Sequence, residues 1–139
     1  MSDFREKVIE HIAINAVSTR KLYVYSHPGV PKDIGFVKIG ETDQKSVYER
    51  VRQDHLTNEV EFEILGEYLG VDANNNIVSD KDIHAILRQM GYNPRKKSDS
   101  DRSGEWFEIE FEKADRLIKD RLNLTGSYEY LRREKGTYK

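Results

Sequence analysis

The stretch that decides the fold is Lys21-Leu-Tyr-Val-Tyr25, a turn at His27-Pro-Gly-Val-Pro31, and then Gly35-Phe-Val-Lys-Ile-Gly40. Two short runs rich in β-branched and aromatic residues, joined by breaker residues, predict a β-hairpin. Two prolines must lie in the turn, because proline cannot donate to a sheet ladder. We therefore expect strands over about 21–26 and 35–40.

Amphipathic segments surround this hairpin. Apolar residues at helical spacing predict four helices, over about 2–17, 46–56, 79–91 and 111–122. Ser46 and Ser79 are the expected caps of the second and third helices, and Gly91 is the expected stop of the third. That third helix is expected to bury Ile83, Ile86, Leu87 and Met90. Alternation from Val60 to Leu69 predicts a half-buried strand, whereas Glu105–Ile109 fits either a strand or the lead-in to the last helix.

This order of elements predicts an α+β fold, a small and mainly antiparallel three-stranded sheet flanked by helices. We divide the chain into a helix over 1–20 that packs on the domain, the domain itself over 21–124, and a polar tail over 125–139. The tail lacks an apolar period and reads as a linker, so we expect a larger protein in which a helicase or methylase is joined to this domain.

Composition limits the classes of function. The 139 residues carry a net charge of −2, so any nucleic-acid footprint must be local. There is no cysteine, which excludes disulfides and cysteine-bearing zinc sites. The N-terminus shows no secretory signal and no apolar run approaches the roughly 20 residues of a membrane span. A cytoplasmic protein with no membrane partner is expected; the sequence carries no signal for an oligomeric state.

Asp80 and His84 stand four residues apart on a predicted helix, so both project from one side of it. A carboxylate and an imidazole at this spacing can share a divalent metal or hold a water between them. The competing interpretation is an exposed pair worth a few tenths of a kcal/mol. Arg88 extends the same row.

Arg50 flanks the apolar stripe of the preceding helix. Its guanidinium could pair with a phosphate and offset charge that develops in phosphoryl transfer, or it could form an ordinary surface ion pair with Asp54. Tyr23 and Tyr25 share one face of the first strand. A phenol activates water only if a cation lowers its pKa, and Lys38 on the paired strand is the candidate. For Tyr25 we favour a role in the core.

A basic loop follows the third helix. Its cations, with Arg88, form the expected nucleic-acid patch: Arg88, Arg95, Lys96, Lys97 and Arg102. Trp106 is expected to be a core anchor rather than a platform for base stacking. Glu105 could face the same cleft as His84 or cap the following turn.

In this order, Tyr23, Lys38-Ile39-Gly40, Arg50, the block from Asp80 to His84, and Glu105-Trp-Phe107 resemble the GIY-YIG nuclease superfamily over about residues 21–110. The likeness is to a phage and bacterial branch of it. The chain departs from the pattern where Lys21 replaces a glycine, Lys38 a tyrosine and Asp80 a glutamate.

The resemblance implies an antiparallel sheet flanked by helices and cleavage with one divalent ion, Mg²⁺ or Mn²⁺. It implies catalytic roles for Tyr23, Lys38, Arg50 and His84, with Asp80 as the metal ligand. Supporting roles are expected for Tyr25, Gly40, His55 and Glu105. The partner would be DNA.

Three functions therefore compete. The first is a metal-dependent endonuclease domain that hydrolyses DNA phosphodiester bonds. The second is a nucleic-acid-binding module that kept the fold and lost the chemistry, which the residues at Lys38 and Asp80 favour. The third is an interaction domain whose surface charges are merely solvated.

Overall fold

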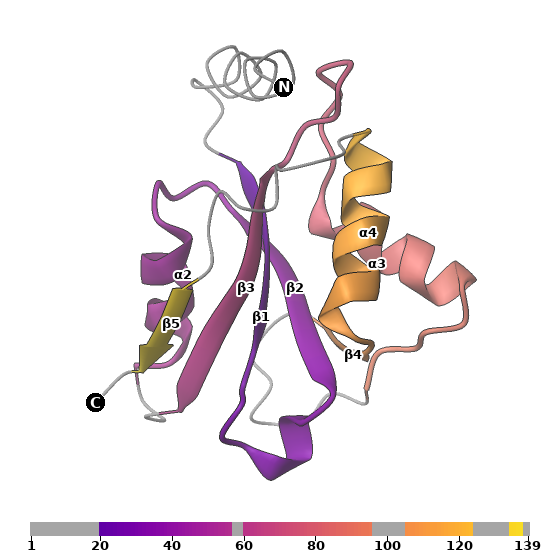
Figure 1. The fold of residues 1–139 in the computed structure, drawn as a ribbon. Coiled ribbons are helices and arrows are strands. Elements are labelled where there is room, and N and C mark those ends of the chain that lie inside the picture. The colour runs from indigo at the N-terminus through magenta and orange to yellow at the C-terminus, as the bar shows by residue number, and fades with distance from the viewer. Residues whose placement is uncertain (1–19, 57–59, 96–104, 124–133, 138–139) are drawn as a thin grey trace, which may run out of the picture.

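The computed structural model contains one antiparallel sheet of five strands, in the order β4-β2-β1-β3-β5 (Figure 1). Their bounds are Lys21–Ser26 for β1, Phe36–Thr42 for β2, Glu61–Leu69 for β3, Glu105–Glu108 for β4 and Glu134–Thr137 for β5. The structure describes residues 20–56, 60–95, 105–123 and 134–137. The helix expected over 2–17 lies outside them.

The predicted hairpin is confirmed, and it forms the centre of the sheet. In its register Tyr23 lies opposite Gly40, and Tyr25 lies opposite Lys38. The connection contains a short 3₁₀ helix, η1, over Pro31–Asp33. It re-enters the sheet through Gly35, whose φ of +86° is the left-handed conformation that glycine adopts without a steric cost.

The sheet has five strands where three were expected. The segment from Glu105 proves to be β4, which pairs with β2. Part of the expected polar tail forms β5, which pairs with β3. β5 reads Glu-Lys-Gly-Thr, and it lies at the edge of the sheet. An edge strand can be held by backbone hydrogen bonds with one neighbour, so its sequence need not show the alternation of a half-buried strand.

Three helices pack on the sheet: α2 over Val47–Asp54, α3 over Asp80–Gln89 and α4 over Phe111–Leu122. The predicted caps are confirmed, since the Ser46 side chain accepts from the Glu49 N–H and Ser79 forms a capping box with Asp82. Met90, expected to be inside, is 60% exposed. The reason is that α3 ends one residue earlier, at Gln89, and the chain turns away through Gly91, whose φ is +95°.

No helix within the described ranges has both the length and the apolar character needed to cross a bilayer.

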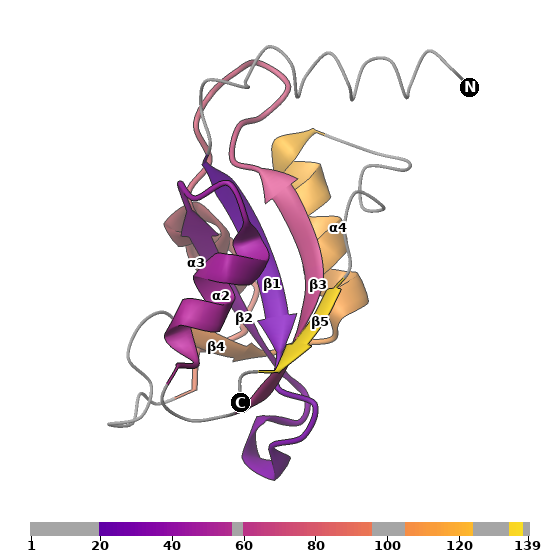
Figure 2. The same cartoon turned by 90° about the vertical axis from the view of Figure 1, so that its left-hand side faces the viewer.

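The helices divide between the two faces of the sheet (Figure 2). α3 and α4 cover one face over a mainly aliphatic core that includes Val24, Ile39 and Phe107. α2 lies on the other face, over a second cluster formed by Tyr23, Tyr25, Val47, Val51, Phe62, Ile64 and Trp106. The register between β1 and β3 shifts by one residue, since Val24 pairs with Gly66 and Tyr25 pairs with Ile64. Because of this irregularity, alternate side chains of β3 change from one face of the sheet to the other along the strand.

Candidate functional site

Tyr23 lies with its ring directly over Gly40, on the face of the sheet that α2 covers. The tyrosine is 2% exposed. A Cβ atom added to Gly40 would come within 2.6 Å of the Tyr23 hydroxyl oxygen and 2.7 Å of the ring. Only glycine leaves room for that ring. Gly40 therefore supports the position of Tyr23.

The electrostatics of Tyr23 differ from the sequence-based expectation. Burial, together with the negative charges of Asp54, Asp80 and Glu41, raises its pKa to about 12, while Arg50 works against them. Lys38, the cation expected to lower this pKa, instead has its Nζ 5.8 Å from the centre of the Tyr25 ring. Near neutral pH Tyr23 is therefore a phenol that can donate a hydrogen bond, and the lowered pKa that activation of water by this group would require is not found.

Arg50 lies in the middle of α2, and its positive charge acts on the Tyr23 phenol. Its Nη1 lies 2.5 Å from Oδ1 of Asp54, one turn further along the helix, with the two side chains 29% and 27% exposed. This is the ion pair that the competing interpretation predicted. A half-exposed pair of this kind contributes about 0–1 kcal/mol, so an incoming anion can displace Asp54 at small cost.

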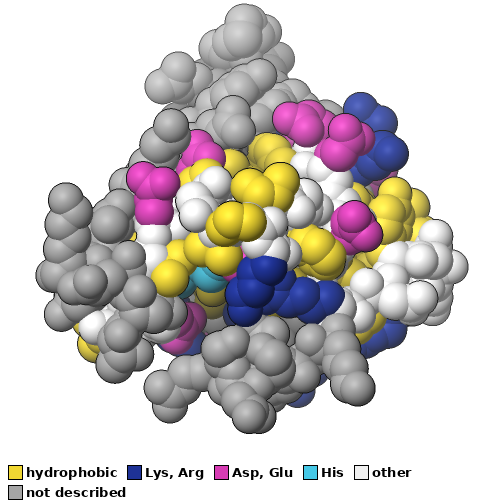
Figure 3. Space-filling view, turned by 90° about the horizontal axis from the view of Figure 1, so that it is seen from below, with side chains coloured by type: hydrophobic (Ala, Val, Ile, Leu, Met, Phe, Trp, Pro, Cys, Tyr) yellow, Lys and Arg dark blue, Asp and Glu magenta, His cyan; other side chains and the backbone are white. Residues whose placement is uncertain are grey.

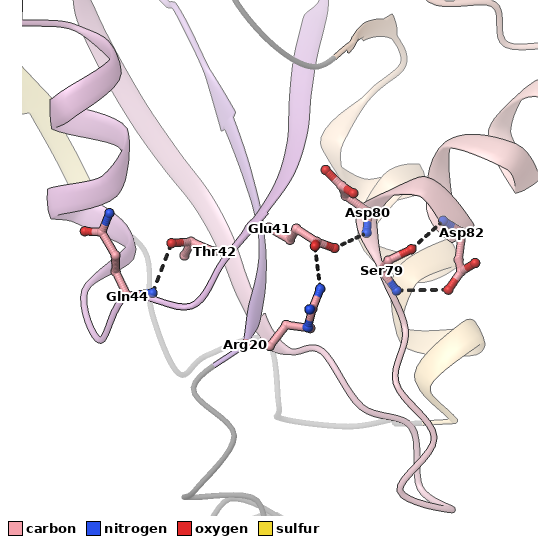
Figure 4. Close-up of polar contacts among 7 residues, drawn as sticks. All are labelled: Arg20, Glu41, Thr42, Gln44, Ser79, Asp80 and Asp82. Atoms are coloured by element: carbon pink, nitrogen blue, oxygen red, sulfur yellow. Dashed lines mark hydrogen bonds and ion pairs between the residues drawn. The ribbon is translucent and has the colours of Figure 1, made fainter.

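Asp80 begins α3 and meets Glu41 of β2, a residue that the sequence analysis did not single out (Figure 4). The Asp80 N–H donates to Oε1 of Glu41 at 2.8 Å, and the other Glu41 oxygen accepts from Arg20. Burial raises the pKa of Asp80, and the negative charge of Glu41 and a side-chain hydrogen bond with it act in the same direction, while His84 lowers it. Two carboxylates therefore face one another here. The only signal in the sequence is the position of Glu41 directly after Lys38-Ile39-Gly40.

His84 lies one turn after Asp80 and is 5% exposed. Its Nε2 contacts the Ile39 carbonyl oxygen at 2.8 Å. A carbonyl only accepts, so Nε2 carries the hydrogen. The ring also packs on Phe107, with 5.3 Å between ring centres. His84 thus ties α3 to β2 and positions the helix turn that carries Asp80.

Tyr23, Arg50, Glu41 and Asp80 converge at the end of β2. The pairing of β4 with β2 reaches only Ile39, so residues 40–42 extend past β4. α2 supplies a cation above this end of the strand, and α3 supplies a carboxylate below it. The charges of one guanidinium and two carboxylates therefore act on a neutral phenol at this end of the strand.

The remaining expected site residues lie elsewhere. Tyr25, Lys38 and His55 are buried further down the α2 face, where Tyr25 stacks on Tyr23 with 6.0 Å between ring centres. Trp106 is a core anchor, as expected, at 5% exposed. Glu105 begins β4 opposite Ile39.

The expected nucleic-acid patch is only partly described. Arg88 is exposed on α3. Arg95 forms an ion pair with Asp33, its side chain 17% exposed, and stacks on the rings of Phe36 and Trp106. Lys96, Lys97 and Arg102 lie outside the described residues.

A second polar cluster escaped the sequence analysis. It joins His27, Asp33 and His55 at the opposite end of the α2 face. His27 and Asp33 both lie in the connection between β1 and β2, where the sequence indicates only a turn. No residue pattern in this connection indicates that it contacts the end of α2.

The chain matches the model of a protein family. The model of the T5orf172 domain matches residues 21–122, which is most of the chain. No curated protein and no solved structure matched. The family is one of nuclease-like and DNA-binding domains, so a domain that acts on DNA is supported.

This match corrects the family expected from the sequence. The motifs around Tyr23, Lys38-Ile39-Gly40 and Arg50 suggested the GIY-YIG superfamily, but the family that matches is a different one. The motifs were short, and the chain departed from the pattern at Lys21, Lys38 and Asp80. By the match over residues 21–122, this chain belongs to the T5orf172 domain family.

Proposed function

We propose that this chain is a metal-dependent endonuclease domain that hydrolyses DNA phosphodiester bonds. The observation that carries the proposal is that the charges of Arg50, Asp80 and Glu41 all act on the Tyr23 phenol at the end of β2. Hydrolysis of a phosphodiester needs cations on the non-bridging oxygens, a positioned water and a donor for the leaving oxygen. A site with this mixture of groups suits that chemistry better than a purely structural ion-pair network.

The donor set suits a hard divalent cation. Asp80 and Glu41 would hold Mg²⁺ or Mn²⁺, and the ion would supply positive charge to a phosphate oxygen. Among the described residues, no group of three or more His, Cys, Asp or Glu side chains could hold a metal. Two carboxylates are nevertheless sufficient for Mg²⁺, which keeps several waters and is usually bound through one or two carboxylates.

The chain's own groups have distinct roles in this proposal. Arg50 exchanges Asp54 for a phosphate and pairs with it bidentately. Tyr23 keeps its proton and donates a hydrogen bond to an oxygen of the scissile group. His84 acts as a positioning residue, because its Nε2–H is committed to the Ile39 carbonyl. Lys38 lies against Tyr25 and supports the aromatic stack.

The experiment compares two arginines on the same helix. Arg50→Ala is expected to lower the rate of plasmid nicking by roughly 10²–10³-fold, the effect of removing one preorganised donor from a site of charge development. Arg52→Ala is the matched control, since Arg52 also lies on α2 and pairs with a helix neighbour, Glu49. Equal loss in both variants, or no nicking by the unmodified chain with either metal, would contradict the proposal.

Removal of the metal gives a second test. EDTA is expected to abolish nicking, and added Mg²⁺ or Mn²⁺ to restore it. Asp80→Asn should prevent this restoration, whereas Glu112→Gln, which alters a carboxylate in the first turn of α4, should not. Nicking that is indifferent to EDTA would exclude the metal.

A second candidate function is a DNA-binding module without cleavage. It is favoured by the raised pKa of Tyr23, which removes the phenolate as a base, and by the existing partners of both Glu41 oxygens. This alternative predicts DNA binding that persists in EDTA and no nicking with any metal.

A further inference from the structure

A hydrogen-bonded chain of side chains joins the β1–β2 connection to the end of α2. Nδ1 of His27 lies 2.7 Å from Oδ2 of Asp33, and Nε2 of His27 lies 2.7 Å from Nε2 of His55. The chain ends where Nδ1 of His55 contacts the Val51 carbonyl oxygen at 2.6 Å. Two imidazoles are thus linked nitrogen to nitrogen, with an acceptor at each outer end.

The cluster is shielded from water. Asp33 is 3% exposed, His55 is 2% exposed, and the side chain of His27 is 12% exposed. The Trp106 ring centre lies 4.6 Å from that of His27, and the Phe62 ring centre 4.9 Å from that of His55. Figure 3 shows histidine atoms set back among hydrophobic side chains beside a group of basic ones. If both imidazoles were positively charged, their repulsion inside this enclosure would be only weakly screened by water.

Hydrogen counting decides what lies between the two rings. The Val51 carbonyl only accepts, so Nδ1 of His55 carries a hydrogen. One oxygen of the Asp33 carboxylate pairs with Arg95 and the other accepts a hydrogen bond from Nδ1 of His27, so Nδ1 of His27 carries a hydrogen as well. With both outer nitrogens protonated, two neutral rings would point lone pairs at each other across 2.7 Å. An attractive contact at this distance requires one further proton between the Nε2 atoms.

We propose that His27 and His55 share a single proton, and that this bond holds the end of α2 against the β1–β2 connection and so positions Arg50. His55 caps the C-terminus of α2, and Arg50 lies in the same two-turn helix. The pair is therefore a positioning device for the phosphate-binding arginine. The effect of this pair on DNA binding rests on the function proposed above. The shared proton itself does not depend on that function.

The charges around the pair allow one extra proton and oppose a second. Asp33 and Asp54 face it with negative charge, Arg95 and Lys38 with positive charge, and Tyr25 as a neutral phenol. Burial lowers the pKa of each ring, so desolvation opposes any added proton, and the hydrogen bond between the two Nε2 atoms must offset that cost for the first one. A second proton would place two N–H groups opposite each other and break the bond. The bond therefore stabilises the fold only while the pair holds one proton: it is lost when the shared proton leaves at higher pH, and lost again when a second proton enters as the pH falls.

The direct test is nuclear magnetic resonance of the full, ¹⁵N-labelled chain. Near neutral pH, the Nε2 signals of His27 and His55 should correlate with one common proton. His84, whose Nε2–H donates to the Ile39 carbonyl, is the internal control for a ring outside the pair. The Arg50 Nε–H signal should shift on acidification with the same midpoint as the pair. Two lone-pair Nε2 signals, or an Arg50 signal that ignores this titration, would overturn the proposal.

Two substitutions separate the bond from mere packing. In His55→Gln the amide can donate to or accept from His27, so the link persists without a shared proton, and the acid shift of Arg50 should disappear. His55→Leu removes the link. It should weaken binding of a short DNA duplex in EDTA on the order of tenfold, since a displaced positioning contact can cost up to about 10²-fold.

His55→Gln should bind like the unmodified chain, and Arg52→Ala supplies a control on the same helix. Equal weakening by His55→Gln and His55→Leu would overturn the positioning role. If no duplex binds at any salt concentration, the proposed function fails, and the histidine and Arg50 spectra still decide the shared proton.

Discussion

The two faces of the sheet are built from different kinds of side chain. Beneath α3 and α4 the core is mainly aliphatic, with His84 and Tyr68 bonded at its margin. Beneath α2 the core is aromatic and contains the buried Lys38 and His55. Buried titratable groups are costly unless they are bonded. The comparison therefore indicates that the first face mainly stabilises the fold, while the second combines stability with function.

The largest effects on stability are expected from substitution of two phenylalanines, one on each face of the sheet. Phe107 lies under α3 and α4, Phe62 lies under α2, and both are 0% exposed. Each substitution to alanine should lower the free energy of unfolding by about 3–5 kcal/mol, because it leaves a cavity. Chemical denaturation measures the loss. Only Phe62→Ala should also shift the imidazole signals of His55, whose ring it contacts. Ile77→Ala, at a 64% exposed site, is the control.

A smaller loss of stability is expected from Gly40→Ala. The new Cβ would lie within 2.6 Å of the Tyr23 hydroxyl, and overpacking of this kind costs about 1–3 kcal/mol. Nicking should fall as well, because Tyr23 is displaced from the site. Gly29→Ala is the control, since its nearest neighbour would be an ordinary 3.5 Å away. Similar unfolding energies for the two variants would show that the ring moves freely.

Asp80→Asn should increase stability while it removes activity. Burial and the Glu41 charge raise the pKa of Asp80, so the folded state favours the protonated acid that asparagine mimics. Because the site is partly screened by solvent, the gain near neutral pH should be at most about 1 kcal/mol. It should diminish as the pH falls towards the ordinary range of a carboxyl. Thermal unfolding at two pH values measures it, and a destabilised variant would contradict the carboxylate pair.

The finest test of the comparison is the titration of Tyr23. Its pKa of about 12 against the model-compound value of 10.0 means that the folded state keeps this proton when the unfolded state has lost it. Stability should therefore decline as the pH rises from about 10 to about 12. The difference in tyrosinate absorbance between the unmodified chain and Tyr23→Phe should have its midpoint near the upper value. A midpoint near 10 would mean that the phenol is solvated.

Much of the fold could be predicted from residues close together in the sequence. The hairpin, both serine caps, the α3–Gly91 stop and the α+β class follow from local preference and periodicity. β5 could not be predicted, because an edge strand held by backbone bonds carries no hydrophobic alternation. Within the candidate site, Arg50 and Asp80 were named from residue type and spacing together with the family resemblance. Glu41 and His27 were missed, since each acquires its role from a partner on another element.

By itself the sequence determined which segments become helices and strands and which side chains share a face, because these depend on neighbours within a turn or two. Only the tertiary structure decided that Glu41 meets Asp80, 39 residues away, and that His27 meets His55, 28 residues away. The physical reason is that strand register, the irregularity in β3 and the seating of each helix bring such groups within bonding distance, and burial then changes their protonation. A pattern of residue types contains neither the distance nor the burial.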